Sequence, residues 1–132
     1  MTLCTYDRNP ILARDSVHRA FVVFCERLAL RGTAVGRYVV MPEHLHLFIR
    51  LAPGHRLGAT IGFLKKSLSS VLKEEGVGGP HWQPSFFDHL MRHDESYAEK
   101  WVYVVENPVR AGLVACGADW PYQGEIVTID RA

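Results

Sequence analysis

The feature that most constrains the fold is a pair of adjacent strand-like segments followed by a long amphipathic helix. Residues 33–41 and 44–51 are rich in β-branched and apolar residues, and Pro42 and Glu43 turn the chain between them. A helix is then predicted over residues 56–75. Its buried stripe has helical spacing and consists of Leu57, Ile61, Leu64, Leu68, Val71 and Leu72.

Three further elements surround this central unit. A strand is predicted over residues 2–6, and a helix over residues 16–31 with Asp15 as its N-cap. A fourth strand is predicted over residues 86–91, after the second helix. The order βαββαβ is that of the ferredoxin-like split βαβ pattern, so we expect an α+β fold with an antiparallel sheet.

A third helix is predicted near the C-terminal end. Ser96 and Glu99 have the spacing of a capping box, which predicts the start of this helix. Asn107-Pro108 should end it, because the residue before a proline disfavours helical angles. A short strand is predicted over residues 126–129.

Composition limits the class of protein more than it defines the function. The 132 residues, 48% of them hydrophobic, predict one packed domain over residues 1–132. The net charge of +1 means that any DNA contact requires local clusters of basic residues. The N-terminal segment lacks the features of a signal peptide, and the run Ala20–Cys25 is too short to span a membrane. The three cysteines form no Cys-x-x-Cys pair, so reduced thiols in a cytoplasmic protein are expected.

Two histidines in the third predicted segment form a candidate metal site. In a strand, His44 and His46 point to the same face, whereas Leu45 and Leu47 point to the opposite one. Two imidazoles side by side can bind a metal, although a third ligand is needed. The alternative is that both are surface histidines on a half-exposed strand.

Tyr103 and Asn107 are candidates for the remaining chemistry. They lie four residues apart, so a helix places them on one face. The amide oxygen of Asn107 is a hard, neutral metal ligand. A phenol is a poor nucleophile unless a nearby cation or base favours its ionised form. The alternative is that Tyr103 packs in the core beside Trp101 and Val104.

These segments together resemble a known protein family. Met41-Pro42-Glu43-His44-Leu45-His46-Leu47 resembles the Met-Pro-(Asn/Asp)-His-hydrophobic-His-Leu signature of the HUH transposases. The segment from Tyr103 to Val114 resembles the tyrosine helix of the REP-associated tyrosine transposases, relatives of the small single-tyrosine transposases of bacterial insertion sequences. Aromatic segments at 82–88 and 120–122 match similar patches of that family, and the resemblance extends from residue 2 to about 122.

The resemblance implies an HUH fold with an additional C-terminal catalytic helix. It implies that His44 and His46 bind Mg²⁺ or Mn²⁺, that Tyr103 is the nucleophile, and that Asn107 occupies a ligand position. The implied reaction is cleavage and transfer of single-stranded or hairpin DNA through a covalent 5′-phosphotyrosine, by a monomer or a homodimer. Glu43 departs from the signature, and we expect it to be a solvated turn residue in preference to a partner of an imidazole.

Four basic residues are predicted to contact DNA. Lys66 and Lys73 recur on one side of the second helix with Lys65 adjacent, and Arg110 follows Tyr103. The alternative for the lysines is a solvated helix face. His81, His89 and His93 are interpreted as surface histidines without a role in the site.

Two other functions remain open at this point. A domesticated HUH domain would bind hairpin DNA without cutting it. A metal-dependent hydrolase on the same fold would activate water and would work without Tyr103.

Overall fold

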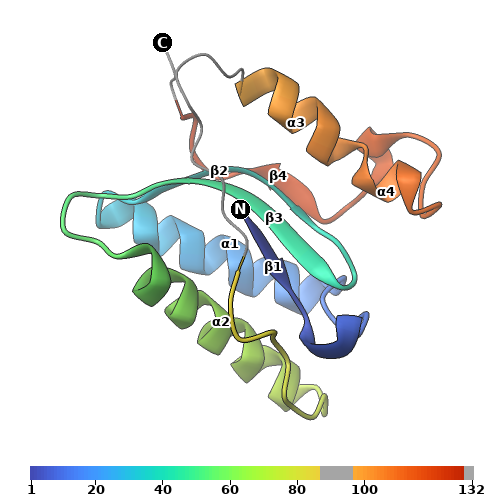
Figure 1. Cartoon of the computed structure of the whole chain (residues 1–132), viewed down its shortest axis with the longest axis horizontal. Helices are drawn as coiled ribbons and strands as arrows, with labels where there is room; N and C mark the ends of the chain where they lie inside the picture. The colour runs from blue at the N-terminus through green and yellow to red at the C-terminus, as the bar shows by residue number, and fades with distance from the viewer. Residues whose placement is uncertain (87–96, 130–132) are drawn as a thin grey trace.

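The computed structural model describes residues 1–86 and 97–129 (Figure 1). In chain order its elements are β1 (Thr2–Cys4), a 3-10 turn (Tyr6–Arg8), α1 (Asp15–Leu30), β2 (Ala34–Val40), β3 (His44–Arg50), α2 (Leu57–Glu74), α3 (Tyr97–Val105), α4 (Asn107–Arg110), a second 3-10 turn (Gly117–Asp119) and β4 (Gln123–Glu125). No helix in these two ranges is both long enough and apolar enough to cross a membrane.

The four strands form one antiparallel sheet in the order β1-β3-β2-β4, which confirms the predicted α+β class. The bounds of the strand predicted at 126–129 are wrong: the structure has β4 at Gln123–Glu125, where it pairs with β2. Gly124 makes this pairing close, because a Cβ at this position would lie 2.9 Å from the hydroxyl oxygen of Tyr38. Backbone hydrogen bonds of 3.1 Å continue beyond the strand at Ile126 and Val127.

The predicted fourth strand, residues 86–91, lies outside the described residues except for Phe86. The preceding segment runs along the edge of β1 that β3 does not occupy: Trp82 forms a bridge with Thr5, and the Gln83 amide donates to the Cys4 carbonyl at 3.1 Å. The chain therefore approaches residue 86 beside β1, where a split βαβ sheet has its fourth strand.

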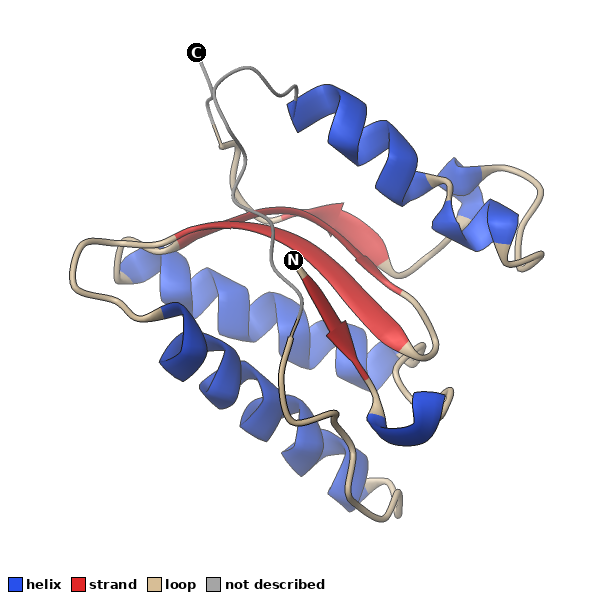
Figure 2. Cartoon of the chain, viewed as in Figure 1, coloured by secondary structure: helices blue, strands red, loops and turns tan. Residues whose placement is uncertain are grey.

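Helices cover both faces of the sheet (Figures 1 and 2). α1 and α2 lie together on one face, and α3 and α4 lie on the other. Leu45 and Leu47 of β3 point toward the first face and are buried there. They belong to the main core, which also includes Leu3, Val17, Phe21, Cys25, Ile61, Leu64, Leu68 and Leu72. The apolar stripe of α2 and the leucine side of β3 therefore lie in the same core, as predicted.

A second, smaller core attaches α3 to the opposite face. Val39, Met41 and Trp120 are buried there, with Trp101 and Val104 of α3 packed against them. The Trp120 indole N–H donates to the Val40 carbonyl at 2.9 Å, which ties the C-terminal segment to β2. This cluster fixes the position of α3 relative to β2 and β3.

Two predicted helix boundaries are wrong. Asp15 is the first residue of α1, after Arg14 as N-cap, and its carboxylate accepts a 3.1 Å hydrogen bond from the Tyr122 hydroxyl. The third helix does not end at Asn107: α3 ends at Val105, and Asn107 begins α4. Pro108 is tolerated because it lies in the first turn of α4, where its missing N–H would have no helical partner. The proposed capping residue Ser96 lies outside the described residues.

Candidate active site

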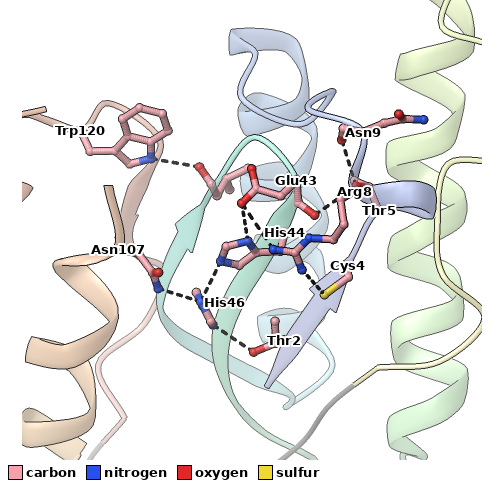
Figure 3. A network of polar contacts seen from close by, with 11 residues as sticks. Thr2, Cys4, Thr5, Arg8, Asn9, Glu43, His44, His46, Asn107 and Trp120 are labelled. Atoms are coloured by element: carbon pink, nitrogen blue, oxygen red, sulfur yellow. Dashed lines mark hydrogen bonds and ion pairs between the residues drawn. The ribbon is translucent and has the colours of Figure 1, made fainter. Parts of the chain in front are cut away.

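His44 and His46 lie on the same face of β3, as the strand pattern predicted, and their rings converge (Figure 3). The two Nε2 atoms are 3.0 Å apart, and the ring planes are inclined at 85°. His46 contacts α4, and both side chains lie on the side of the sheet opposite Leu45 and Leu47. The alternative of two surface histidines is inconsistent with this geometry, because His44 is only 8% exposed.

The outer nitrogen of each imidazole has its own partner. The Nδ1 of His44 lies 2.9 Å from a carboxylate oxygen of Glu43, and the Nδ1 of His46 lies 3.0 Å from the hydroxyl of Thr2 on β1. A carboxylate only accepts hydrogen bonds, so the Nδ1 of His44 carries the hydrogen and its Nε2 presents a lone pair. Such partners orient metal-binding histidines and fix their tautomer.

Glu43 is therefore not the solvated turn residue that we expected. Its carboxylate contacts His44 and also forms an ion pair with Arg8, at 3.7 Å. Arg8 in turn donates to the sulfur of Cys4 at 3.3 Å and has a left-handed backbone, with φ at 53°. Sequence reasoning missed Arg8 and Thr2, since their proximity to the histidines depends on how β1 pairs with β3 and gives no local sequence signal.

Burial keeps both imidazoles neutral. The pKa of His46 is lowered to about 3, mainly by desolvation and in smaller part by the positive charges of His44, the N-terminus and Arg110. Desolvation also lowers the pKa of His44, although the Glu43 carboxylate opposes this shift. At neutral pH both rings are therefore in the form that can ligate a metal.

Asn107 reaches the histidine pair from α4. One terminal atom of its amide, assigned as nitrogen, lies 2.8 Å from the Nε2 of His46. Rotating the amide by half a turn presents its oxygen at the same point, and the choice between the two orientations depends on the hydrogen on that imidazole. Among the described residues no three His, Cys, Asp or Glu side chains gather in a metal-binding group. In this part of the chain the third protein ligand beside the two Nε2 atoms would therefore be Asn107.

This donor set fits a divalent cation. The Nε2 atoms of the two neutral imidazoles face each other at 3.0 Å. At this distance their lone pairs repel each other unless a proton or a cation lies between them. Imidazole nitrogen and amide oxygen are ligands that Mn²⁺ accepts, and Mg²⁺ accepts the oxygen readily while retaining water.

Tyr103 lies on the surface, 69% exposed, so the alternative of a core tyrosine is wrong. It belongs to α3 and Asn107 to α4, yet Glu106 between them keeps near-helical angles. The guanidinium carbon of Arg110 lies 4.3 Å from the centre of the Tyr103 ring, and its Nη2 donates to the Tyr103 carbonyl at 2.9 Å.

The three predicted DNA-binding lysines do not form one surface. The ammonium group of Lys65 donates to the carbonyls of Gln83 and Ser85, both at 3.0 Å, and so ties α2 to the segment beside β1. Lys73 is exposed near the end of α2. Lys66 lines a groove of about 600 Å³ between α1 and α2. α2 covers the sheet face opposite the histidine pair, so none of these lysines is part of the site.

Sequence reasoning missed the other cations of that groove. Arg27, Arg31 and Arg56 line it together with Lys66, and none of the carboxylates in the described residues does. The spacing of Arg27, in the last turn of α1, and Arg31, its C-cap, was a usable signal, because residues four apart share one helix face. Arg56 precedes α2, and only the packing of α2 against α1 brings it near the other two.

The interpretation of the remaining histidines holds in part. His81 is buried, not at the surface, and its ring nitrogens contact the Ser69 hydroxyl and the Val77 carbonyl, both at 2.9 Å. It is thus a satisfied structural histidine. His89 and His93 lie outside the described residues.

The chain is similar to known proteins in sequence and in structure. Residues 1–104 match the family model described as "Transposase IS200 like". A Haemophilus influenzae protein named among the REP-associated tyrosine transposases is 27% identical over 139 residues, which cover 92% of this chain and 75% of that protein. The REP-associated tyrosine transposase of Escherichia coli K12 is 29% identical over 93 residues, 70% of this chain, and the match spans only about half, 54%, of that relative.

A solved structure supports the same fold. The structure of a REP-associated tyrosine transposase bound to a REP hairpin superposes with a TM-score of 0.73 and 21% sequence identity, over 98% of this chain and 87% of that one. The similarity confirms the expected HUH fold.

Proposed function

Because this chain belongs to the IS200-like transposase family, we propose that it cuts and rejoins single-stranded DNA through a covalent 5′-phosphotyrosine on Tyr103. The observation that carries this proposal is the convergence of His44, His46 and Asn107, with Tyr103 exposed one helical turn before Asn107. The family gives the general activity, and these residues suggest the chemistry.

His44, His46 and Asn107 would hold Mg²⁺ or Mn²⁺. When bound, such a cation polarises a phosphate oxygen and helps to orient the phosphate for attack. The protein's own contribution is orientation: Glu43 and Thr2 fix the two imidazoles, and α4 carries Asn107 to them.

Tyr103 would supply the nucleophilic oxygen. Its hydroxyl oxygen forms a bond to phosphorus and loses its proton to solvent, while the bond from phosphorus to the 3′ oxygen breaks and that oxygen takes up a proton. One phosphodiester replaces another, so rejoining by the reverse attack needs no nucleotide cofactor.

The proposed substrate is single-stranded DNA with a hairpin. The structural relative is bound to a REP hairpin, and the groove between α1 and α2 is lined by four cations and, within residues 1–86 and 97–129, by no carboxylate. We assign Lys66 and the three arginines of that groove to phosphates outside the cleaved strand, since they lie across the sheet from Tyr103. Lys73 would extend this basic surface along α2.

The decisive experiment incubates the protein with hairpin oligonucleotides and Mn²⁺. If Tyr103 attacks, a label at the 3′ end of the DNA stays on the protein in a denaturing gel, and a label at the 5′ end leaves with a free 3′-OH. Tyr103→Phe removes only the exposed hydroxyl, so folding and DNA binding should persist while adduct and cleavage disappear together. Tyr97→Phe, also on α3, is the matched control and should form the adduct.

Two other results would replace the proposal. Cleavage by Tyr103→Phe would assign the reaction to an activated water. Tight hairpin binding by the wild type, with no adduct under Mg²⁺ or Mn²⁺, would make the chain a DNA-binding module.

A further inference from the structure

Arg110 is fixed above the ring of Tyr103 in two ways. Its guanidinium lies over the ring, 4.3 Å from guanidinium carbon to ring centre, which is within the range of a cation–π contact. Its Nη2 also donates to the Tyr103 carbonyl at 2.9 Å. The first contact restrains the ring and the second anchors the guanidinium to the backbone of the same residue.

The ring needs such a restraint because little else surrounds it. Tyr103 is 69% exposed and its neighbour Val102 is 61% exposed, so the Tyr103 ring is largely open to solvent apart from its contact with Arg110. A ring that samples several side-chain rotamers would present its hydroxyl in the attacking position only part of the time.

The same short helix also carries Asn107. α4 is a single turn, closed by hydrogen bonds of 2.9 Å from Arg110 to the Glu106 carbonyl and from Ala111 to the Asn107 carbonyl. Its first residue contacts His46 and its last residue contacts Tyr103. α4 therefore links the proposed nucleophile to the histidine pair through two side chains of one hydrogen-bonded turn.

We propose that Arg110 is a positioning residue for Tyr103, which it holds in one orientation relative to His44 and His46, and not a contact to DNA phosphate. This inference rests on the proposed function of Tyr103. Arginine suits the role because its planar guanidinium can cover a ring and donate a hydrogen bond from its edge simultaneously, whereas an ammonium group cannot do both.

The test separates chemistry from binding. With saturating hairpin DNA and Mn²⁺, Arg110→Gln should slow single-turnover adduct formation by about 10- to 100-fold, the range expected for a misplaced reactive group. Its Kd for the hairpin and the salt dependence of that Kd should match the wild type. Arg110→Lys should recover part of the rate, and Arg19→Gln, an exposed arginine of α1, should change neither quantity.

Two outcomes overturn the proposal. A weaker Kd with a salt slope reduced by about one, at an unchanged rate, would make Arg110 a phosphate contact. Unchanged rate and unchanged Kd would leave it without a role in the reaction.

A measurement without DNA keeps this inference separate from the proposed function. In the protein alone, the Arg110 side-chain protons should resonate upfield because they lie over an aromatic ring, and Tyr103→Leu should abolish that shift. If the shift is present and the wild type forms no adduct, the proposed reaction fails although the contact exists. If the shift is absent, the positioning role itself fails.

Discussion

At the scale of single residues, the site depends on which face of β3 a side chain occupies. His44 and His46 were predictable, since strand alternation is a local property of the chain. The function of Glu43 was not, because a residue in a turn gives no indication of whether it folds back on its neighbour or faces water. Its carboxylate lies 2.9 Å from the Nδ1 of His44, so Glu43 helps to orient that imidazole.

Loss of that carboxylate should weaken metal binding. Glu43→Ala is expected to reduce Mn²⁺ affinity by about 10- to 100-fold, as for other partners of metal-binding histidines. Titration calorimetry measures this directly. Glu26→Ala on α1 is a matched removal of a carboxylate away from the site and should leave the affinity unchanged, and equal affinities in both variants would contradict the role of Glu43.

His46 should make the metal-free protein sensitive to acid. In the unfolded chain this ring is protonated below its ordinary pKa of 6.5, whereas in the folded chain its pKa is about 3, so the unfolding free energy falls as the pH drops between these values. From pH 7 to pH 5 this single group should cost about 2 kcal/mol of unfolding free energy. Urea unfolding in a chelator, at both pH values, should show a smaller loss for His46→Gln. An equal loss in the variant would mean that His46 titrates normally.

At the scale of elements, the helices and central strands were predictable from periodicity, and the C-terminal elements were not. The stripe from Leu57 to Leu72 specifies α2 within one or two residues of its observed ends. By contrast, the break between α3 and α4 and the pairing of β4 with β2 depend on contacts from distant residues. Gly117 is one such contact: a Cβ there would lie 2.7 Å from the carbonyl oxygen of Val105, the last residue of α3.

Gly117→Ala should therefore displace the end of α3. The clash involves backbone, so the expected cost is about 1–3 kcal/mol of unfolding free energy, together with slower adduct formation by the displaced Tyr103. Thermal unfolding and the adduct assay measure the two effects.

Gly62→Ala is the control for this substitution. Gly62 lies inside α2 with open space at its Cβ position, so alanine should stabilise the protein by about 0.5–1 kcal/mol. If Gly117→Ala behaved in the same way, α3 would not depend on this close approach.

At the scale of the whole molecule, one sheet separates two surfaces with different chemistry. The histidine pair contacts Asn107 of α4, and Tyr103 belongs to α3. The basic groove lies between α1 and α2. Figure 1 shows these two pairs of helices on opposite faces of the sheet. Changes in the groove should alter DNA affinity without altering the chemical step.

The salt dependence of hairpin binding tests this separation. Arg56→Gln combined with Lys66→Gln should reduce the slope of log K against log salt by about one to two units, since each lost phosphate contact removes about 0.7–0.9. Arg19→Gln removes a cation of α1 that does not line the groove and should leave the slope intact. A slope unaffected by the double variant would make the groove irrelevant to DNA.

The alternation along β3 also has a consequence for how this protein can lose its activity. Leu45 and Leu47 belong to the main core, and the histidines on either side of Leu45 belong to the site, so a slip of one residue would exchange the two sets. Such a slip is strongly disfavoured because it would take the buried leucines out of the core. The same cost keeps the histidines on their face of the strand. Insertions and deletions in the turn at Pro42 and Glu43 should therefore either be absorbed there or unfold the chain. A stably folded but inactive descendant should arise by substitution at His44, His46 or Tyr103, on an unchanged strand register.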